Sequence, residues 1–124
     1  MLKNYAKKLN KPIHIALVGC GRISNNHLKA ILYYKEKAKV VALCDTNTEN
    51  LENTYKLITN EKKNFPQNKT PLLYSDFDLL LQDHKHQKIK IDLIVLATPS
   101  GLHAPLTVKA ARSGINVCTE KPMA

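Results

Sequence analysis

Short apolar runs alternate along this chain with longer stretches in which apolar residues recur every three or four positions. The runs have the length of buried β-strands, and the stretches have the period of amphipathic α-helices. The predicted strands are 13–18, 40–44, 72–74, 91–97 and 116–119. Because strands that alternate with helices are typical of a parallel sheet, the sequence predicts an α/β fold. We expect a Rossmann-type, doubly wound parallel sheet of about five strands with helices on both faces.

The first two predicted helices each carry an apolar face. The face of the first consists of Ile23, His27, Ala30, Ile31 and Tyr34, so His27 is interpreted as a packing residue. The second begins at a capping box running from Thr46 to Glu49, and its buried face consists of Leu51, Tyr55 and Ile58. The polar segment 60–71, which contains two prolines, is predicted to be a long surface loop.

Two more helices are predicted in the second half of the chain. The segment 75–78 resembles a helix cap ahead of Leu80 and Leu81. Pro105 suits the first turn of the last helix, and Gly114 suits its end. The inner face of that helix is predicted to consist of Leu106, Ala110 and Ala111.

A glycine-rich turn links the first strand to the first helix, with the sequence Gly19-Cys20-Gly21-Arg22-Ile23-Ser24. Glycine allows a sharp turn and a close approach of the backbone to a pyrophosphate, which then meets free amides at a helix N-terminus. Ser24 stands where glycine or alanine is usual and crowds the helix–strand contact slightly. The turn favours dinucleotide binding, and the alternative is a tight turn without a ligand.

Asp45 stands at the end of the second predicted strand, where a carboxylate can accept hydrogen bonds from both hydroxyls of an adenosine ribose. The same charge repels a 2′-phosphate, and residues 46–48 offer no arginine to bind one. NAD is therefore favoured over NADP as the cofactor. The alternative is a helix-capping aspartate.

The composition sets further bounds. The chain has 124 residues, 44% of them hydrophobic, which suits one modest core. Residues 1–11 form a basic arm, and 12–124 form the predicted dinucleotide-binding domain. No apolar stretch is long enough to span a membrane, so a cytoplasmic location is expected. Seventeen of the nineteen basic residues are scattered lysines, which argues against nucleic acid as a partner despite a net charge of +9.

The cysteines and histidines do not have the spacing of metal ligands. Cys20, Cys44 and Cys118 are odd in number and are interpreted as reduced structural thiols. His84 and His86 lie in a lysine-bearing turn with no third ligand nearby. We therefore expect no metal.

Two later motifs complete an ordered pattern with the glycine turn and Asp45. They are Thr98-Pro99-Ser100-Gly101-Leu102-His103 and Glu120-Lys121-Pro122. From Pro12 to Ala124 the chain resembles the N-terminal half of the glucose-fructose oxidoreductase / inositol dehydrogenase / MocA family. The resemblance implies a Rossmann domain holding NAD or NADP, and oxidation of a sugar or cyclitol hydroxyl. The two terminal motifs look most like members that oxidise nucleotide-linked sugars for surface polysaccharides.

The resemblance also implies roles for individual residues. Lys121 is the implied catalytic residue near the nicotinamide and the reacting carbinol, and Glu120 helps to fix the nicotinamide ribose. The implied cofactor-binding residues are Gly19, Gly21, Arg22, Ile23, Asp45, Thr98, Pro99, His103 and Glu120. From the residues alone, Lys121 and His103 could instead be surface residues, and Arg22 could cap the turn.

The family's C-terminal substrate domain is absent from this sequence, which stops after the Glu-Lys-Pro motif. The 124-residue segment is therefore expected to bind a nicotinamide dinucleotide without turnover. A sugar-like substrate and a homo-oligomer are expected only for a full-length chain. The alternative is a stand-alone, non-catalytic nucleotide-binding or regulatory module.

Overall fold

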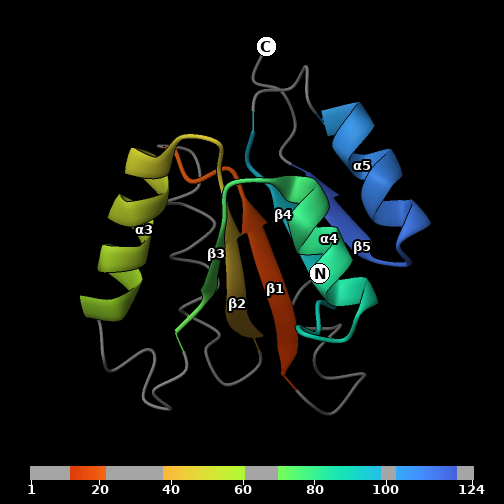
Figure 1. Cartoon of the computed structure of the whole chain (residues 1–124), viewed down its shortest axis with the longest axis horizontal. Helices are drawn as coiled ribbons and strands as arrows, with labels where there is room; N and C mark the ends of the chain where they lie inside the picture. Colours follow the sequence, from red (N-terminus) through yellow and green to blue (C-terminus); the bar gives the residue numbers. More distant parts are fainter. Residues whose placement is uncertain (1–11, 22–37, 61–69, 99–102, 120–124) are drawn as a thin grey trace.

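The computed structural model describes residues 12–21, 38–60, 70–98 and 103–119 of the chain. Within these residues a five-stranded parallel sheet has the strand order β3-β2-β1-β4-β5 (Figure 1). Its strands are β1 (Ile13–Val18), β2 (Ala38–Cys44), β3 (Leu72–Tyr74), β4 (Leu93–Leu96) and β5 (Asn116–Thr119). The described helices are α3 (Thr48–Asn60), α4 (Phe77–Lys85) and α5 (His103–Arg112). The predicted parallel α/β sheet is thus confirmed.

Side chains of the central strands alternate between two hydrophobic clusters, because successive residues of a strand point to opposite faces of the sheet. In β1, Ile13, Ile15 and Leu17 enter one cluster together with residues of α3, chiefly Leu51 and Ile58. Ala16 and Val18 of β1 enter the other cluster, to which α4 and α5 contribute. Helices therefore cover both faces of the sheet, as a doubly wound fold requires.

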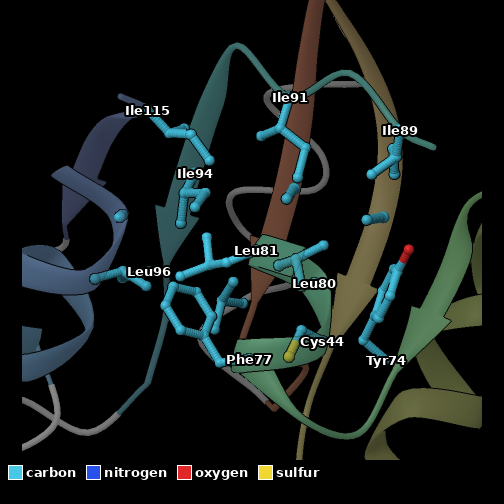
Figure 2. Close-up of a cluster of buried hydrophobic side chains, with 14 residues drawn as sticks. Cys44, Tyr74, Phe77, Leu80, Leu81, Ile89, Ile91, Ile94, Leu96 and Ile115 are labelled. Atoms are coloured by element: carbon cyan, nitrogen blue, oxygen red, sulfur yellow. The ribbon is translucent and has the colours of Figure 1, made fainter. Parts of the chain in front are cut away.

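The cluster beneath α4 is shown in Figure 2. Phe77 and Leu81 of α4 lie toward Ile94 and Leu96 of β4, and Leu80 of the same helix belongs to the same cluster. All four residues of β4 are buried, as expected for a strand covered on both faces. This strand lies beside β1, so the same packing supports the centre of the sheet.

The ends of two strands differ from the sequence prediction. β2 begins at Ala38, two residues before the predicted start at 40, and a register shift between Ile15 and Ala16 accommodates an extra residue in β2. β4 is shorter than the predicted 91–97. Ile91 donates its backbone N–H to His84 Nδ1 at 3.2 Å instead of continuing the strand.

The helix caps were predicted with mixed success. Asp76 caps α4 by accepting a hydrogen bond from the Asp78 backbone N–H at 2.8 Å, which confirms the predicted cap. The predicted cap of α3 was one residue early, because Asn47 Oδ1 accepts from the Asn50 backbone N–H at 3.0 Å. Glu49 then lies inside the first turn of α3.

The last helix, α5, ends at Arg112, and Gly114 just beyond it has a φ of +75°, as suits the predicted helix-terminating glycine. Ala110 is fully buried on its inner face, and Leu106 is partly buried against the same cluster. The assignment of Ala111 to that face was wrong, since its side chain is exposed. A helix of 3.6 residues per turn places residue 111 about 100° from residue 110, which here is enough to reach solvent.

Two predicted segments fall wholly or mostly outside the described residues. The first helix, with Ile23, His27, Ala30, Ile31 and Tyr34, lies in 22–37. Residues 61–69 of the predicted 60–71 loop are also outside. At the edges of that loop, Asn60 ends α3, and Pro71 is buried rather than on the surface.

Candidate functional site

The order of the strands reverses at β1, which marks a candidate site at the carboxyl end of the sheet. From β1 the chain builds outward to β2 and β3 on one side and to β4 and β5 on the other. Ligands of open α/β sheets bind at such a reversal of strand order, beyond the carboxyl ends of the strands. Gly19 and Gly21 follow β1, Asp45 follows β2, and Thr98 follows β4. These four predicted site residues are therefore brought to one edge.

Gly19 is confined by the neighbouring strand. Its φ is +95°, and a Cβ at this position would lie 2.8 Å from the carbonyl carbon and oxygen of Ala97 and 2.9 Å from the Thr98 backbone nitrogen. The Gly19 backbone N–H donates to the Cys44 carbonyl at 2.7 Å. Only glycine permits this backbone angle together with this contact. The turn is thereby fastened to β2 and pressed against the end of β4.

Asp45 fixes the glycine turn through its carboxylate. Oδ2 accepts a hydrogen bond from the Cys20 backbone N–H at 2.7 Å, and Oδ1 accepts one from the Asn47 backbone N–H at 2.8 Å. A carboxylate can accept about four hydrogen bonds, so the half-buried side chain keeps acceptor capacity for a ligand. The second bond lies just before α3, yet Asn47 rather than Asp45 caps that helix.

Cys20 and Cys44 are buried thiols that flank this carboxylate. Burial, with a smaller effect from the Asp45 charge, raises the pKa of each thiol to about 12. They remain protonated at neutral pH, and both are free thiols, as is the partly buried Cys118. The interpretation of all three as reduced structural residues is consistent with this state.

Thr98 and His103 lie next to one another on the β4 side. The His103 ring nitrogen Nε2 lies 2.6 Å from the Thr98 carbonyl oxygen. The Thr98 hydroxyl oxygen is buried and has no hydrogen-bond partner among the residues that the structure describes. An unpartnered buried hydroxyl is unusual in a native protein, and a bound ligand is one way to satisfy it.

The structure also shows a supporting residue that the sequence reasoning did not identify. Thr54 of α3 is 4% exposed and donates its hydroxyl hydrogen to the Cys20 carbonyl at 3.2 Å. It fastens the glycine turn to α3. Its signal in the sequence was a polar residue three positions after Leu51, on the apolar face of a predicted helix.

The remaining predicted site residues lie outside the described part of the chain. They are Arg22, Ile23, Pro99, Glu120 and Lys121. Among the described residues, no cluster of three or more histidine, cysteine or acidic side chains could hold a metal ion. None of the described helices is long and apolar enough to cross a membrane.

A glycine turn after β1, a carboxylate after β2 and the reversal of strand order together define a dinucleotide-binding Rossmann domain. Residues 13–124 match the Gfo/Idh/MocA family model, described as an oxidoreductase family with an NAD-binding Rossmann fold. The chain belongs to this family.

Three proteins to which the chain is similar show the range of the family. The crystal structure of the WlbA dehydrogenase from Bordetella pertussis, in complex with NADH and UDP-GlcNAcA, has 37% identity and a TM-score of 0.73 over 92% of this chain and 30% of that one. A D-apiose dehydrogenase from Paraburkholderia graminis is 31% identical over 88% of this chain and 25% of its own length. A glycosyl hydrolase family 109 protein from Shewanella pealeana is 25% identical over 90% of this chain and 23% of its own length. The chain thus spans about a quarter of the length of these curated relatives.

Proposed function

We propose that this chain is the cofactor domain of an NAD-dependent oxidoreductase that oxidises a hydroxyl of a sugar, nucleotide sugar or cyclitol. The observation that carries the cofactor assignment is the hydrogen-bonded arrangement of Gly19, Cys20 and Asp45 at the reversal of strand order. The 37% identity to a dehydrogenase solved with NADH and a UDP-linked sugar favours a nucleotide sugar as substrate.

In this proposal each half of the sheet binds one half of the dinucleotide through residues of this chain. Asp45 follows β2 and accepts hydrogen bonds from the adenosine ribose, with Arg22 and Ile23 beside the pyrophosphate. Thr98 and Pro99 follow β4 and lie on the nicotinamide side, where Glu120 helps to fix the ribose. Bound NAD supplies the hydride acceptor. Lys121 hydrogen-bonds the substrate hydroxyl and assists removal of its proton.

Replacement of Asp45 by alanine is expected to weaken NADH binding by about 1 to 3 kcal/mol, because paired ribose hydrogen bonds are lost. Because Asp45 also holds the glycine turn, its loss could weaken the binding of any dinucleotide. NADPH therefore serves as the internal control. The wild-type chain should prefer NADH, whereas Asp45→Ala should lose most of that preference because its carboxylate no longer repels the 2′-phosphate. Titration of both dinucleotides, followed by nicotinamide fluorescence, measures the ratio.

A second surface carboxylate serves as the matched control for this experiment. Asp78 of α4 forms an exposed ion pair with Lys109 of α5, with 3.0 Å between Lys109 Nζ and Asp78 Oδ1. Asp78→Ala should leave both dissociation constants unchanged. Unchanged NADH affinity in Asp45→Ala would remove Asp45 from the site, and equal binding of NADPH by the wild-type chain would contradict the preference for NAD.

The substrate class is tested by turnover of the full gene product, followed through NADH absorbance. UDP-linked sugars should be oxidised faster than free sugars or inositols. Lys121→Met should lower kcat by about 10²- to 10⁴-fold, as is typical for loss of a proton-transferring group, while NADH still binds. Release of a free sugar from a glycoside without net NADH formation would instead place the protein with the glycosyl hydrolase relative.

A further inference from the structure

A hydrogen bond from α5 holds the backbone just after β4. The His103 ring lies at the first residue of α5, and its Nε2 is 2.6 Å from the Thr98 carbonyl oxygen. A carbonyl oxygen can only accept a hydrogen bond, so Nε2 must carry the hydrogen and donate it. This fixes the neutral ring as the Nε2–H tautomer. It also means that Nε2 is already engaged and is not available to a ligand.

The same stretch of backbone is held from the opposite direction by the glycine turn. The Ala97 backbone N–H donates to the Val18 carbonyl at 2.8 Å, at the end of β1. The Ala97–Thr98 peptide lies so close to Gly19 that a Cβ there would approach it to 2.8–2.9 Å. The Ala97–Thr98 peptide is therefore confined by Gly19, and the Thr98 carbonyl that follows it is held by the His103 ring.

The group that this arrangement orients is the Thr98 side chain. Its hydroxyl oxygen is buried and has no partner within the described segments, which is costly unless a ligand satisfies it. Thr98 follows β4, on the half of the sheet opposite Asp45. In a Rossmann fold the two halves each bind one mononucleotide, so this side receives the nicotinamide half.

We propose that His103 is a positioning residue, whose Nε2–H holds the Thr98 carbonyl so that the Thr98 hydroxyl can hydrogen-bond the nicotinamide half of the dinucleotide. This inference rests on the proposed binding of NAD. It replaces direct contact between His103 and the cofactor with an action through Thr98. It also explains why a histidine stands at the start of a helix whose next two residues are exposed.

Three substitutions separate the donor from the rest of the ring. The amide nitrogen of glutamine reaches about as far from the backbone as Nε2, whereas that of asparagine reaches only as far as Nδ1. His103→Leu and His103→Asn should therefore raise the NADH dissociation constant by roughly 3- to 10-fold, the range for one lost hydrogen bond. His103→Gln should restore it to within about 2-fold of wild type.

ADP distinguishes a local effect from general damage, because it contains only the adenosine half and the phosphates. Its affinity should be the same in all four proteins. Lys109→Ala, an exposed change on the same helix, should change the affinity for neither NADH nor ADP. Nitrogen-15 NMR of the histidine rings supplies a readout without ligand, and the neutral His103 ring should be protonated at Nε2.

Several outcomes would overturn the inference while leaving the proposed function intact. These are unchanged NADH affinity in His103→Leu, an equal loss of ADP affinity, recovery with asparagine but not with glutamine, or a ring protonated at Nδ1. Failure of the wild-type chain to bind NADH at all would overturn the proposed function as well. The wild-type titration therefore separates the two failures.

Discussion

Gly19→Ala is expected to destabilise the fold by about 2 to 5 kcal/mol and to abolish NADH binding. A non-glycine residue at positive φ costs about 1 to 2 kcal/mol, and Gly19 has a φ of +95°. The added Cβ also meets the Ala97 carbonyl group at 2.8 Å, and a backbone group cannot rotate away as a side chain can. Overpacking of this kind costs about 1 to 3 kcal/mol more. Any relief of the collision must separate β1 from β4, where the cofactor site lies.

Gly114→Ala is the matched control for this prediction. Gly114 also has a positive φ, of +75°, but no described atom lies within 4 Å of the Cβ that alanine would add. Gly114→Ala should lose only the conformational cost of a positive φ, about 1 to 2 kcal/mol of stability, and the folded variant should still bind NADH. Urea denaturation and NADH titration of both variants measure the difference. Equal losses of stability would show that the contact with Ala97 is not tight, and retained NADH binding in Gly19→Ala would contradict its place in the site.

The sequence predicted the sheet well because short apolar runs mark its central strands, which are largely buried. Strands β1, β3 and β5 have the predicted ends. The ends of β2 and β4 were missed because they depend on distant partners. Ala38 joins the sheet by pairing with Ile13, and Ile91 lies before β4 with its backbone N–H donated to His84 Nδ1. Neither partner is visible from local periodicity.

The sequence indicated which residues follow the strands at this edge of the sheet, but not the hydrogen bonds between them. The glycine turn and Asp45 were recognised from their order and spacing, which the Rossmann fold imposes. That Asp45 also holds the Cys20 backbone, and that Thr54 holds it from the other side, depends on how α3 packs on the sheet. The hydrogen bond between the His103 ring and the Thr98 carbonyl was not visible in the sequence either. Such contacts arise between segments that no local pattern connects.

Leu80→Ala is expected to destabilise the chain by about 2 to 5 kcal/mol, the range for removing a buried leucine from a packed core. Leu80 is fully buried in α4, among the side chains that cover β1, β2 and β4 (Figure 2). The remaining cavity would lie under a rigid sheet and could not easily collapse. Since the folded site is unchanged, the variant should bind NADH with near wild-type affinity at a temperature where it remains folded.

The adjacent leucine provides the control, because Leu79 lies on the same helix and is 50% exposed. Leu79→Ala should change the free energy of unfolding by no more than about 0.5 kcal/mol, as for most surface substitutions. Urea denaturation of the two variants, with equal m-values, measures their free energies of unfolding. NADH at about 100 times its dissociation constant should add about 2.7 kcal/mol to the free energy of unfolding of each variant. Similar losses for the two leucines would mean that α4 does not pack on this face of the sheet. A ligand-induced gain in Leu79→Ala but not in Leu80→Ala would mean that the packing beneath α4 reaches the cofactor site, and that stability and binding are coupled through β1 and β4.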